Sequence, residues 1–430
     1  MSWRTNLWLV PSLTVTGSLG VFVATQSFDR AQHVGGVYLP GWLDQGGAAD
    51  ARSLLAATAG AIITTLGLVL SITVLTLSIA ASQFGQRLFR RYMCDKGTQL
   101  CIGTFAATFV FSLLTLMSAT SRMNEKEFVP WLSVWVSTLW AISCIGVLIY
   151  YIHHVAVIIQ VNTIVADIAA DFHRAVHASQ SAMGRSMPPI PEISPDVMLI
   201  APMAGYIQRI DYPSLVLAAG EVDGIVRFLH RPGQFVVKGG TMAIAACRRL
   251  PGSKLQAIFE NAVTIGMRRT ERHDNEFALS QIVEIALRAM SPGLNDPTTA
   301  LTCVDWLGDS IRALARYPRL SPTHVDKHGN VRVIEKVNEF DRVVAAAFDP
   351  IRQVARNSPM LTIRLRNTFS SIAPFMQTTT QRGALYNQVE MAFEAFTAEA
   401  VSGDRADVLA AYYRAVRALR PAWSPAGRVG

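Results

Sequence analysis

Small and hydroxyl-bearing residues recur at helical spacing within an apolar stretch that runs from residue 54 to residue 83 without a charged side chain. The spacing of 4, 3, 4, 7 and 4 positions places the first six on one face of a helix, and the seventh extends the polarity: Gly60, Thr64, Gly67, Ser71, Ser78, Ser82 and Gln83. Such a face is suited to line a hydrophilic pore, because hydroxyl oxygens act as ion ligands. It is equally suited to helix packing, since small residues let membrane helices approach closely and their hydroxyls bond to backbone carbonyls.

A looser series of hydroxyl side chains follows in the next apolar stretch: Thr104, Thr108, Ser112 and Thr115. It suits a pore wall or the other half of one packed interface. The central turns of the apolar stretches carry no Asp, Glu, Lys or Arg, on which proton-coupled transporters and voltage sensors depend. The chain also lacks the inverted repeat from which many secondary transporters are built. A pore would therefore need several copies of this chain around an axis.

A short turn motif joins two predicted helices in the C-terminal half: Ser291, Pro292, Gly293, Asn295, Asp296 and Pro297. The Pro-Gly pair stops the first helix, and Asp296 is placed to cap the second, with Pro297 at its first position. A free helix N-terminus binds anions, but a carboxylate at the cap opposes that. The motif is therefore a structural joint or a binding site.

Sequence signatures of common catalytic sites are absent: the chain has no Walker A loop, GxSxG, HExxH or GxGxxG after a strand. The adjacent His153 and His154 diverge by about 100° on a helix and do not suit one metal ion. His173 and His177 are four residues apart on a polar helix and are expected to be solvated. We expect no enzyme activity, cofactor or metal. One mixed-charge cluster is a salt network at a subunit interface or a site: Arg268, Arg269, Arg272, His273, Asp274 and Glu276.

The elements that would position these residues are set by a strong asymmetry of composition. Residues 1–160 hold 9 of the 39 Lys and Arg and 6 of the 31 Asp and Glu. Four apolar stretches in this part are long enough to cross a bilayer: about 7–25, 54–83, 100–118 and 129–160. The loop after the second is basic, and basic short loops are cytoplasmic. We expect four spans with both termini in the cytoplasm of a bacterial cell, in its inner membrane.

Residues beyond the fourth span have the composition of a soluble α+β part. We expect a helical stalk and linker at 161–195, continuous with the fourth span, then a small antiparallel β barrel or sandwich-like module at 196–250. A mainly helical domain at 251–420 and a tail at 421–430 follow. The predicted strands are 197–200, 206–210, 215–217, 224–228, 235–237 and 242–246, and a further strand is predicted at 331–337. The segments at 201–207 and 232–240 resemble the strands of biotinyl- and lipoyl-type domains, without the attachment lysine.

The five cysteines show no CxxC spacing and fit free thiols in a reducing compartment. The formal net charge of +8 comes from interspersed residues without a long basic run, so no nucleic-acid partner is expected.

The chain resembles a family of bacterial membrane proteins of unknown function, domain of unknown function 2254. The resemblance rests on the segment from Ser71 to Arg87 and on the segment from Asp274 to Pro297. It implies an inner-membrane location and no established activity. We expect a homo-oligomeric ion channel with a cytoplasmic vestibule or gating domain. The alternative is a non-conducting scaffold or sensor whose soluble part binds a partner or a small ligand.

Overall fold

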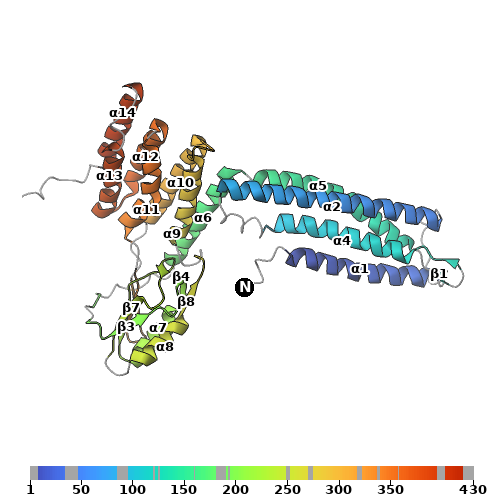
Figure 1. Cartoon of the computed structure of the whole chain (residues 1–430), viewed down its shortest axis with the longest axis horizontal. Coiled ribbons are helices and arrows are strands. Elements are labelled where there is room, and N and C mark those ends of the chain that lie inside the picture. Colours follow the sequence, from blue (N-terminus) through green and yellow to red (C-terminus); the bar gives the residue numbers. More distant parts are fainter. Residues whose placement is uncertain are drawn as a thin grey trace, which may run out of the picture. The chain divides into compact units, whose positions relative to one another are not determined.

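The computed structural model describes residues 8–33, 47–84, 95–119, 122–123, 126–158, 160–180, 190–191, 194–247, 252–269, 275–316, 322–336, 339–356, 358–394 and 402–419. The chain separates into two compact units, Met1–Thr163 and Ile164–Gly430, which we call the membrane unit and the soluble unit (Figure 1). The basic loop around Arg87 and the tail after residue 420 lie outside the described residues.

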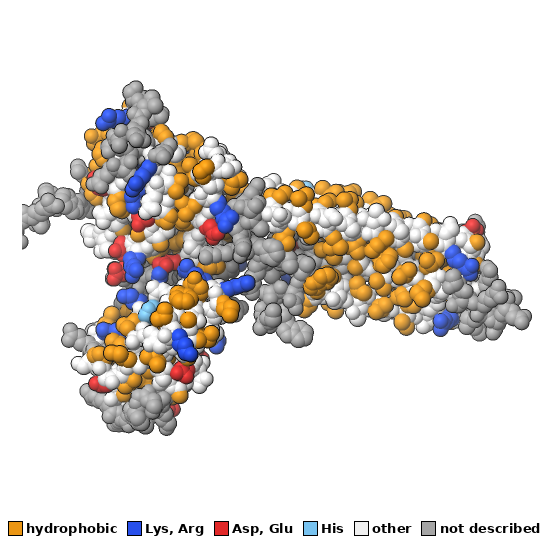
Figure 2. Space-filling view, in the orientation of Figure 1, with side chains coloured by type: hydrophobic (Ala, Val, Ile, Leu, Met, Phe, Trp, Pro, Cys, Tyr) orange, Lys and Arg blue, Asp and Glu red, His pale blue; other side chains and the backbone are white. Residues whose placement is uncertain are grey.

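Four helices of the membrane unit are long and apolar enough to cross a bilayer, which confirms the predicted membrane-helical class. They are α1 (Leu9–His33), α2 (Ala48–Phe84), α4 (Lys96–Ser118) and α5 (Trp131–Ile158). A two-residue hairpin, β1 (Arg122–Met123) and β2 (Lys126–Glu127), lies between α4 and α5. At 1.5 Å per residue α2 is roughly 55 Å long, well beyond the ~30 Å hydrocarbon core. Figure 2 shows that hydrophobic side chains dominate the visible surface of this unit between its ends.

The centre of the membrane unit is α4, which packs against α1, α2 and α5. Close approach depends on a glycine: a Cβ at Gly103 would meet Thr14 Oγ1 at 2.4 Å and Pro11 Cα at 3.1 Å. The Phe105 and Phe111 rings fill the interior beside it. The packing therefore uses large rings at some levels and near-contact of two backbones at others.

The fourth span and the stalk were expected to form one continuous helix, but they are two helices. Helix α5 ends at Ile158, and α6 (Val161–Gln180) begins the stalk. Between them the amide of Gln160 donates to Val157 O and the amide of Thr163 to Gln160 O, each three residues back. These tighter turns interrupt the i to i−4 ladder of an α-helix.

The β part of the soluble unit contains two sheets. The five-stranded sheet has the order β3-β7-β5-β10-β9, and the three-stranded sheet has the order β6-β4-β8. Their strands are β3 (Val197–Ile200), β4 (Gly205–Ile210), β5 (Ile225–Phe228), β6 (Phe235–Val236), β7 (Thr241–Ala246), β8 (Val263–Gly266), β9 (Thr323–Val325) and β10 (Val331–Ile334). The last three lie beyond residue 250, and β10 pairs with β5 in parallel. The sheets therefore recruit segments that follow the predicted 196–250 range.

The predicted strand at 215–217 is wrong, because this segment lies in helix α7 (Tyr212–Glu221). Asp211 caps this helix by accepting a hydrogen bond from the amide of Ser214, and Pro213 lies in its first turn. The apolar run that suggests a strand instead covers the sheets: Leu215 and Ala219 are buried in the same core as Val226 and Phe228. Helix α8 (Gly252–Ala262) contributes Leu255 and Phe259 to that core.

The remaining soluble unit is helical. It comprises α9 (Asn275–Ala289), α10 (Pro297–Ala315), α11 (Phe340–Ala355), α12 (Pro359–Ile372), the 3₁₀ turn η3 (Ala373–Phe375), α13 (Thr379–Glu394) and α14 (Ser402–Leu419). The amphipathic period of these segments buries one face of each helix. The predicted order of a small β part followed by a mainly helical part is thus present.

Candidate functional site

The hydroxyl stripe of α2 faces away from its own bundle. Five of its members are described with their side chains and all are exposed; we call them the α2 stripe: Gly60, Thr64, Gly67, Ser71 and Ser78. The packed face of α2 carries Leu55, Ile62 and Val69, which are at most 6% exposed. At about 100° per residue, the two faces lie roughly half a turn apart. The side chains of Ser82 and Gln83 lie outside the described residues.

The hydrogen bonds of the α2 stripe that the described residues show are made within its own helix. Thr64 Oγ1 donates to Gly60 O at 2.8 Å, and Ser71 Oγ donates to Gly67 O at 2.9 Å. A Cβ at Gly60 or Gly67 would meet nothing within 4 Å. Since the hydroxyl hydrogens are used within the helix, the remaining oxygen lone pairs face outward as acceptors.

The α2 stripe is narrow and is bordered by large aliphatic side chains. Ile63, Leu70 and Val74 lie along one border, 41–65% exposed, and Leu68 and Leu75 lie along the other, 56% and 61% exposed. The outward face of α5 is mostly aliphatic: its positions 139, 142, 145, 149 and 152, all Leu or Ile, are 56–65% exposed, and Ser143, Gly146 and Tyr150 are exposed beside them. The α5 face is what contact with lipid chains requires, whereas the α2 face is polar along its middle.

The second hydroxyl series, on α4, is largely consumed by packing inside the membrane unit. Thr108, Ser112 and Thr115 are at most 1% exposed. Ser112 Oγ lies 2.7 Å from Ser137 Oγ of α5, and Thr108 Oγ1 lies 3.4 Å from Cys144 Sγ. Thr108 and Ser112 therefore hold α4 against α5 inside the membrane unit.

Further polar contacts inside the bundle have no periodic signal in the sequence. The hydroxyl of Tyr151 lies 2.6 Å from Thr73 Oγ1 and donates to Val69 O at 3.1 Å, which ties α5 to α2. Adjacent helices share buried hydroxyls of this kind because no water is present to satisfy them.

Charged side chains cap helices of the bundle across its interfaces. The Asp29 carboxylate, 3% exposed, accepts hydrogen bonds from the amides of Leu132 and Ser133 and from Ser133 Oγ at 2.9, 3.1 and 2.7 Å. It thus satisfies free amides at the start of α5. Arg52 of α2 donates through Nε and Nη2 to Ala119 O at the end of α4. The sequence analysis predicted neither of these two caps. The feature of the sequence that indicates them is a charged residue beside the end of an apolar stretch.

A third cross-helix contact joins the start of α4 to the end of α5. Asp95 caps α4 by accepting from the amide of Thr98 at 2.7 Å, and the same Oδ2 atom lies 2.8 Å from His154 Nε2. Gly97 permits this approach, because a Cβ there would lie 2.3 Å from the ring. Burial alone would raise the pKa of Asp95, but the Thr98 amide and the His154 ring outweigh it and lower that pKa.

The turn motif of the soluble unit forms the expected joint. Asp296 is the N-cap of α10, accepting from the amide of Thr299 at 3.1 Å and from its hydroxyl at 2.6 Å, and Pro297 opens the helix. Asn295 adopts a left-handed backbone with φ of +42°. The motif is exposed from Pro292 to Asn295. With the cap carboxylate already bonded, the joint accounts for these residues without a ligand.

The mixed-charge cluster lies partly at the junction of the β and helical parts. Arg231 of the β part forms an ion pair with Glu276 of α9. The guanidinium of Arg269 lies 5.5 Å from the Phe277 ring centroid. These contacts place Arg269 and Glu276 at an intramolecular junction, whereas the Arg268 side chain is exposed. Arg272, His273 and Asp274 lie outside the described residues.

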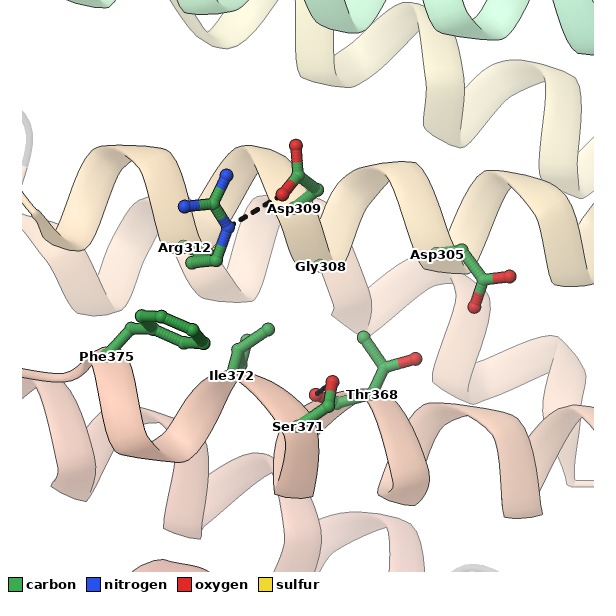
Figure 3. Close-up of a pocket in the computed structure, with 8 residues that line it drawn as sticks. All are labelled: Asp305, Gly308, Asp309, Arg312, Thr368, Ser371, Ile372 and Phe375. Carbon is green, nitrogen blue, oxygen red and sulfur yellow. Dashed lines mark hydrogen bonds and ion pairs between the residues drawn. The ribbon is translucent and has the colours of Figure 1, made fainter.

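A groove between α10 and α12 encloses about 300 Å³ (Figure 3). It is lined by Asp305, Gly308, Asp309, Arg312, Thr368, Ser371, Ile372 and Phe375. Its acids are paired, since Asp305 lies 3.2 Å from Arg364 Nε and Asp309 lies 2.7 Å from Arg312 Nε. His173 of the stalk also approaches Asp309, at 3.4 Å. Burial lowers the pKa of His173 against the opposing effect of Asp309.

One buried cation in the helical part was not predicted. Arg366 of α12 is 0% exposed and donates to Ala392 O and Val408 O, at 3.0 and 2.6 Å. Its guanidinium carbon lies 5.7 and 5.8 Å from the ring centroids of Phe393 and Tyr412, which stack on each other 4.3 Å apart. Burial lowers the pKa of Arg366 to about 10, so the side chain stays charged at neutral pH and ties α12 to α13 and α14. Among the described residues, no group of three His, Cys, Asp or Glu side chains is placed to hold a metal ion.

Comparison with known proteins agrees with the four helices that are long and apolar enough to cross a membrane. A family model described as "Predicted membrane protein (DUF2254)" matches residues 4–371. Uncharacterized proteins of Mycobacterium tuberculosis and Mycobacterium bovis are 29% identical over 423 residues, covering 96% of this chain and 80% of theirs. No solved structure matches the chain. The chain belongs to this family of predicted membrane proteins, DUF2254.

Proposed function

We propose that this protein is the subunit of a homo-oligomeric ion channel in the bacterial inner membrane, with its pore lined by the α2 stripe. The observation that carries the proposal is that this stripe is exposed and, within the part of the chain that the structure describes, bonds only to its own helix, whereas the similar series on α4 is packed. In a ring of copies, the aliphatic borders of α2 would pack against neighbours and leave the polar strip on the axis.

The wall formed in this way presents acceptors rather than donors. Thr64 and Ser71 donate their hydroxyl hydrogens to backbone carbonyls one turn back. Their hydroxyl hydrogens would therefore point away from the pore, and the oxygen lone pairs would face it. Oxygen acceptors favour cations over anions. The glycines between them keep the passage wide, because no side chain extends from those turns. We therefore expect cation conduction.

The soluble unit would form a vestibule or gate on the cytoplasmic side. The basic loop between the second and third spans supports this orientation. A C-terminal reporter that functions only in the periplasm should be inactive, and an active reporter would contradict the orientation.

The pore is tested by flux measurements on the purified protein in liposomes. Ser71→Leu or Ser78→Leu should abolish cation flux, because a ring of leucines in a narrow pore resists wetting. Ser143→Leu is the matched control: Ser143 is also exposed and also bonded to its own helix, at Trp140 O, but it lies on the leucine- and isoleucine-rich face of α5. This variant should conduct like the wild type.

Oligomer integrity decides between the pore and helix packing. Flux lost in Ser71→Leu with an intact assembly, measured by light scattering, supports the pore. An assembly that dissociates in this variant assigns the stripe to packing between copies. Wild-type protein that is monomeric in mild detergent, or Ser71→Leu protein that conducts normally, would overturn the proposal.

The second candidate is a non-conducting sensor, favoured by the groove between α10 and α12. Asp309 belongs both to the groove and to the contact with His173 of the stalk, so an occupant of the groove would act on a residue that holds α6. This alternative predicts that Asp309→Asn changes the protection of α6 against hydrogen exchange. It also predicts that no gradient or potential elicits flux from the intact assembly.

A further inference from the structure

The three-stranded sheet of the soluble unit has an outer face with an unusual character. Its inner residues Ile207, Val236 and Val263 are at most 6% exposed and belong to the core. On the outer face Tyr206 lies opposite Phe235, with ring centroids 5.2 Å apart, and Phe235 is 53% exposed. The solvent face of an antiparallel sheet is ordinarily polar, so two aromatic rings there call for an occupant.

The apolar surface continues beyond the strand ends. Val237 follows Phe235 by two residues, on the same side of the strand, and is 62% exposed. Met267 continues β8 and is 92% exposed. The segment after β8 is held against β4 by a 2.8 Å hydrogen bond from Gln208 Nε2 to Arg268 O. The exposed methionine is therefore carried by a fixed backbone and not by a free loop.

Cations surround this apolar surface. Arg209 lies opposite Thr264 across the β4–β8 ladder, and Lys238 and Arg268 lie two residues beyond the ends of β6 and β8. All three side chains are exposed, and none forms an ion pair within the described part of the chain. Strands β4, β6 and β8 contain no acidic residue. The face is thus both apolar and positively charged.

We propose that this face, the sheet face, docks the soluble unit on the anionic surface of the lipid bilayer; it comprises Tyr206, Arg209, Phe235 and Val237, with Lys238, Met267 and Arg268 exposed just beyond the strand ends. Basic residues attract anionic headgroups, while aromatic and aliphatic side chains enter the boundary between headgroups and acyl chains. The soluble unit is covalently tied to four membrane helices, which keeps the local concentration of bilayer high, so a weak contact suffices.

Charge and composition decide against other occupants. A second copy of the same face would bring its cations against these cations, which is unfavourable. Single-stranded nucleic acid is bound by rows of aromatic rings, whereas Val237 and Met267 are aliphatic. The inference does not depend on ion conduction, because a non-conducting anchor would dock in the same way.

Hydrogen–deuterium exchange on the full-length protein in nanodiscs tests the inference. Segments 203–209, 235–238 and 264–268 should exchange several-fold more slowly in discs that contain phosphatidylglycerol than in pure phosphatidylcholine discs. The difference should vanish in Lys238→Glu/Arg268→Glu and at 0.5 M salt, since screening shortens the reach of surface charge to about 4 Å. Arg405→Glu, an exposed charge reversal on α14, should retain it.

The remaining outcomes overturn the inference. Equal protection in both kinds of disc would show that protein covers the face, and no protection in either would show that it is free. Protection in detergent on addition of single-stranded RNA would assign the face to nucleic acid. Unchanged exchange in β5 and β7 confirms that the double variant is folded, and the salt titration of the wild type tests the inference without any substitution.

Discussion

Helices α2 and α4 carry similar series of hydroxyl side chains and use them in opposite ways. On α4, Thr108 and Ser112 are buried and contact α5. On α2, Thr64 and Ser71 are exposed, and their hydroxyls bond only to their own helix. Composition and spacing do not separate the two cases. The difference is made by which neighbours surround each helix, since α4 is central in the bundle and α2 is peripheral.

This comparison shows that a hydroxyl series on a membrane helix has no fixed meaning. Inside a bundle it supplies hydrogen bonds that the membrane interior cannot. On the outside, the same residues form a surface for other copies or for ions. The following substitutions separate the two roles, beginning with the largest expected effect.

Ser112→Leu should strongly destabilise the membrane unit. The side chain is 0% exposed, so the two added heavy atoms overpack the α4–α5 contact at a cost of about 1–3 kcal/mol. The hydroxyl of Ser137 also loses its partner, which costs about another 1–3 kcal/mol. Thermal unfolding in detergent should report a lower midpoint, while Ser71→Leu should leave the midpoint nearly unchanged. Similar midpoints for both variants would contradict the different packing of the two series.

Gly103→Ala should separate α1 from α4. The new Cβ would meet the backbone of α1 at Pro11 and the Thr14 hydroxyl, so a loss of about 1–3 kcal/mol is expected. The matched variant Gly67→Ala meets nothing and should be neutral or slightly stabilising, because alanine favours helix. Unfolding midpoints of both variants check this, and loss of the oligomer in Gly67→Ala alone would place a neighbouring copy against the α2 stripe.

Acid should weaken the contact between α4 and α5 at Asp95. Its folded pKa is lowered from the ordinary 3.8, so its stabilising effect is present above that pH and is lost as pH falls through the lower folded value. Asn at this position still caps the helix but carries no charge. Asp95→Asn should therefore lower the free energy of unfolding by about 0.5–1 kcal/mol at neutral pH. The unfolding midpoint of this variant should also depend less on pH below 4. An unchanged pH dependence would show that the Asp95 carboxylate is not its cause.

Thr64→Val should have the smallest effect on the protomer. It keeps the shape of an exposed side chain and removes only a hydroxyl bonded within its own helix, so stability should change by less than about 0.5 kcal/mol. Thr108→Val, the matched change in the interior, should cost about 1 kcal/mol. Cation flux in liposomes should fall in Thr64→Val and should stay normal in folded Thr108→Val protein. The opposite pattern would move the pore away from α2.

Much of the architecture follows from local chemistry that the sequence displays directly. Spans of apolar residues fix four membrane helices, because only a continuous helix satisfies its backbone in lipid. The cap at Asp296 and Pro297 is equally local, since the groups that bond to one another are three residues apart. The helix α7 is the counterexample: its apolar run suggests a strand, and the cap at Asp211 and the sheet beneath decide otherwise.

The sequence by itself therefore determined the membrane class, the order of the two parts and the face of α2 that carries hydroxyls. Only the tertiary structure decided that this face points outward and that the α4 series is packed. It also decided that Asp29 and Arg52 cap helices distant in the chain, and that Asp95 contacts His154. The physical reason is how far apart in the sequence the interacting residues lie. A helix face is defined by residues within two turns of one another, whereas its surroundings depend on elements up to about a hundred residues away, such as Ser133 beside Asp29.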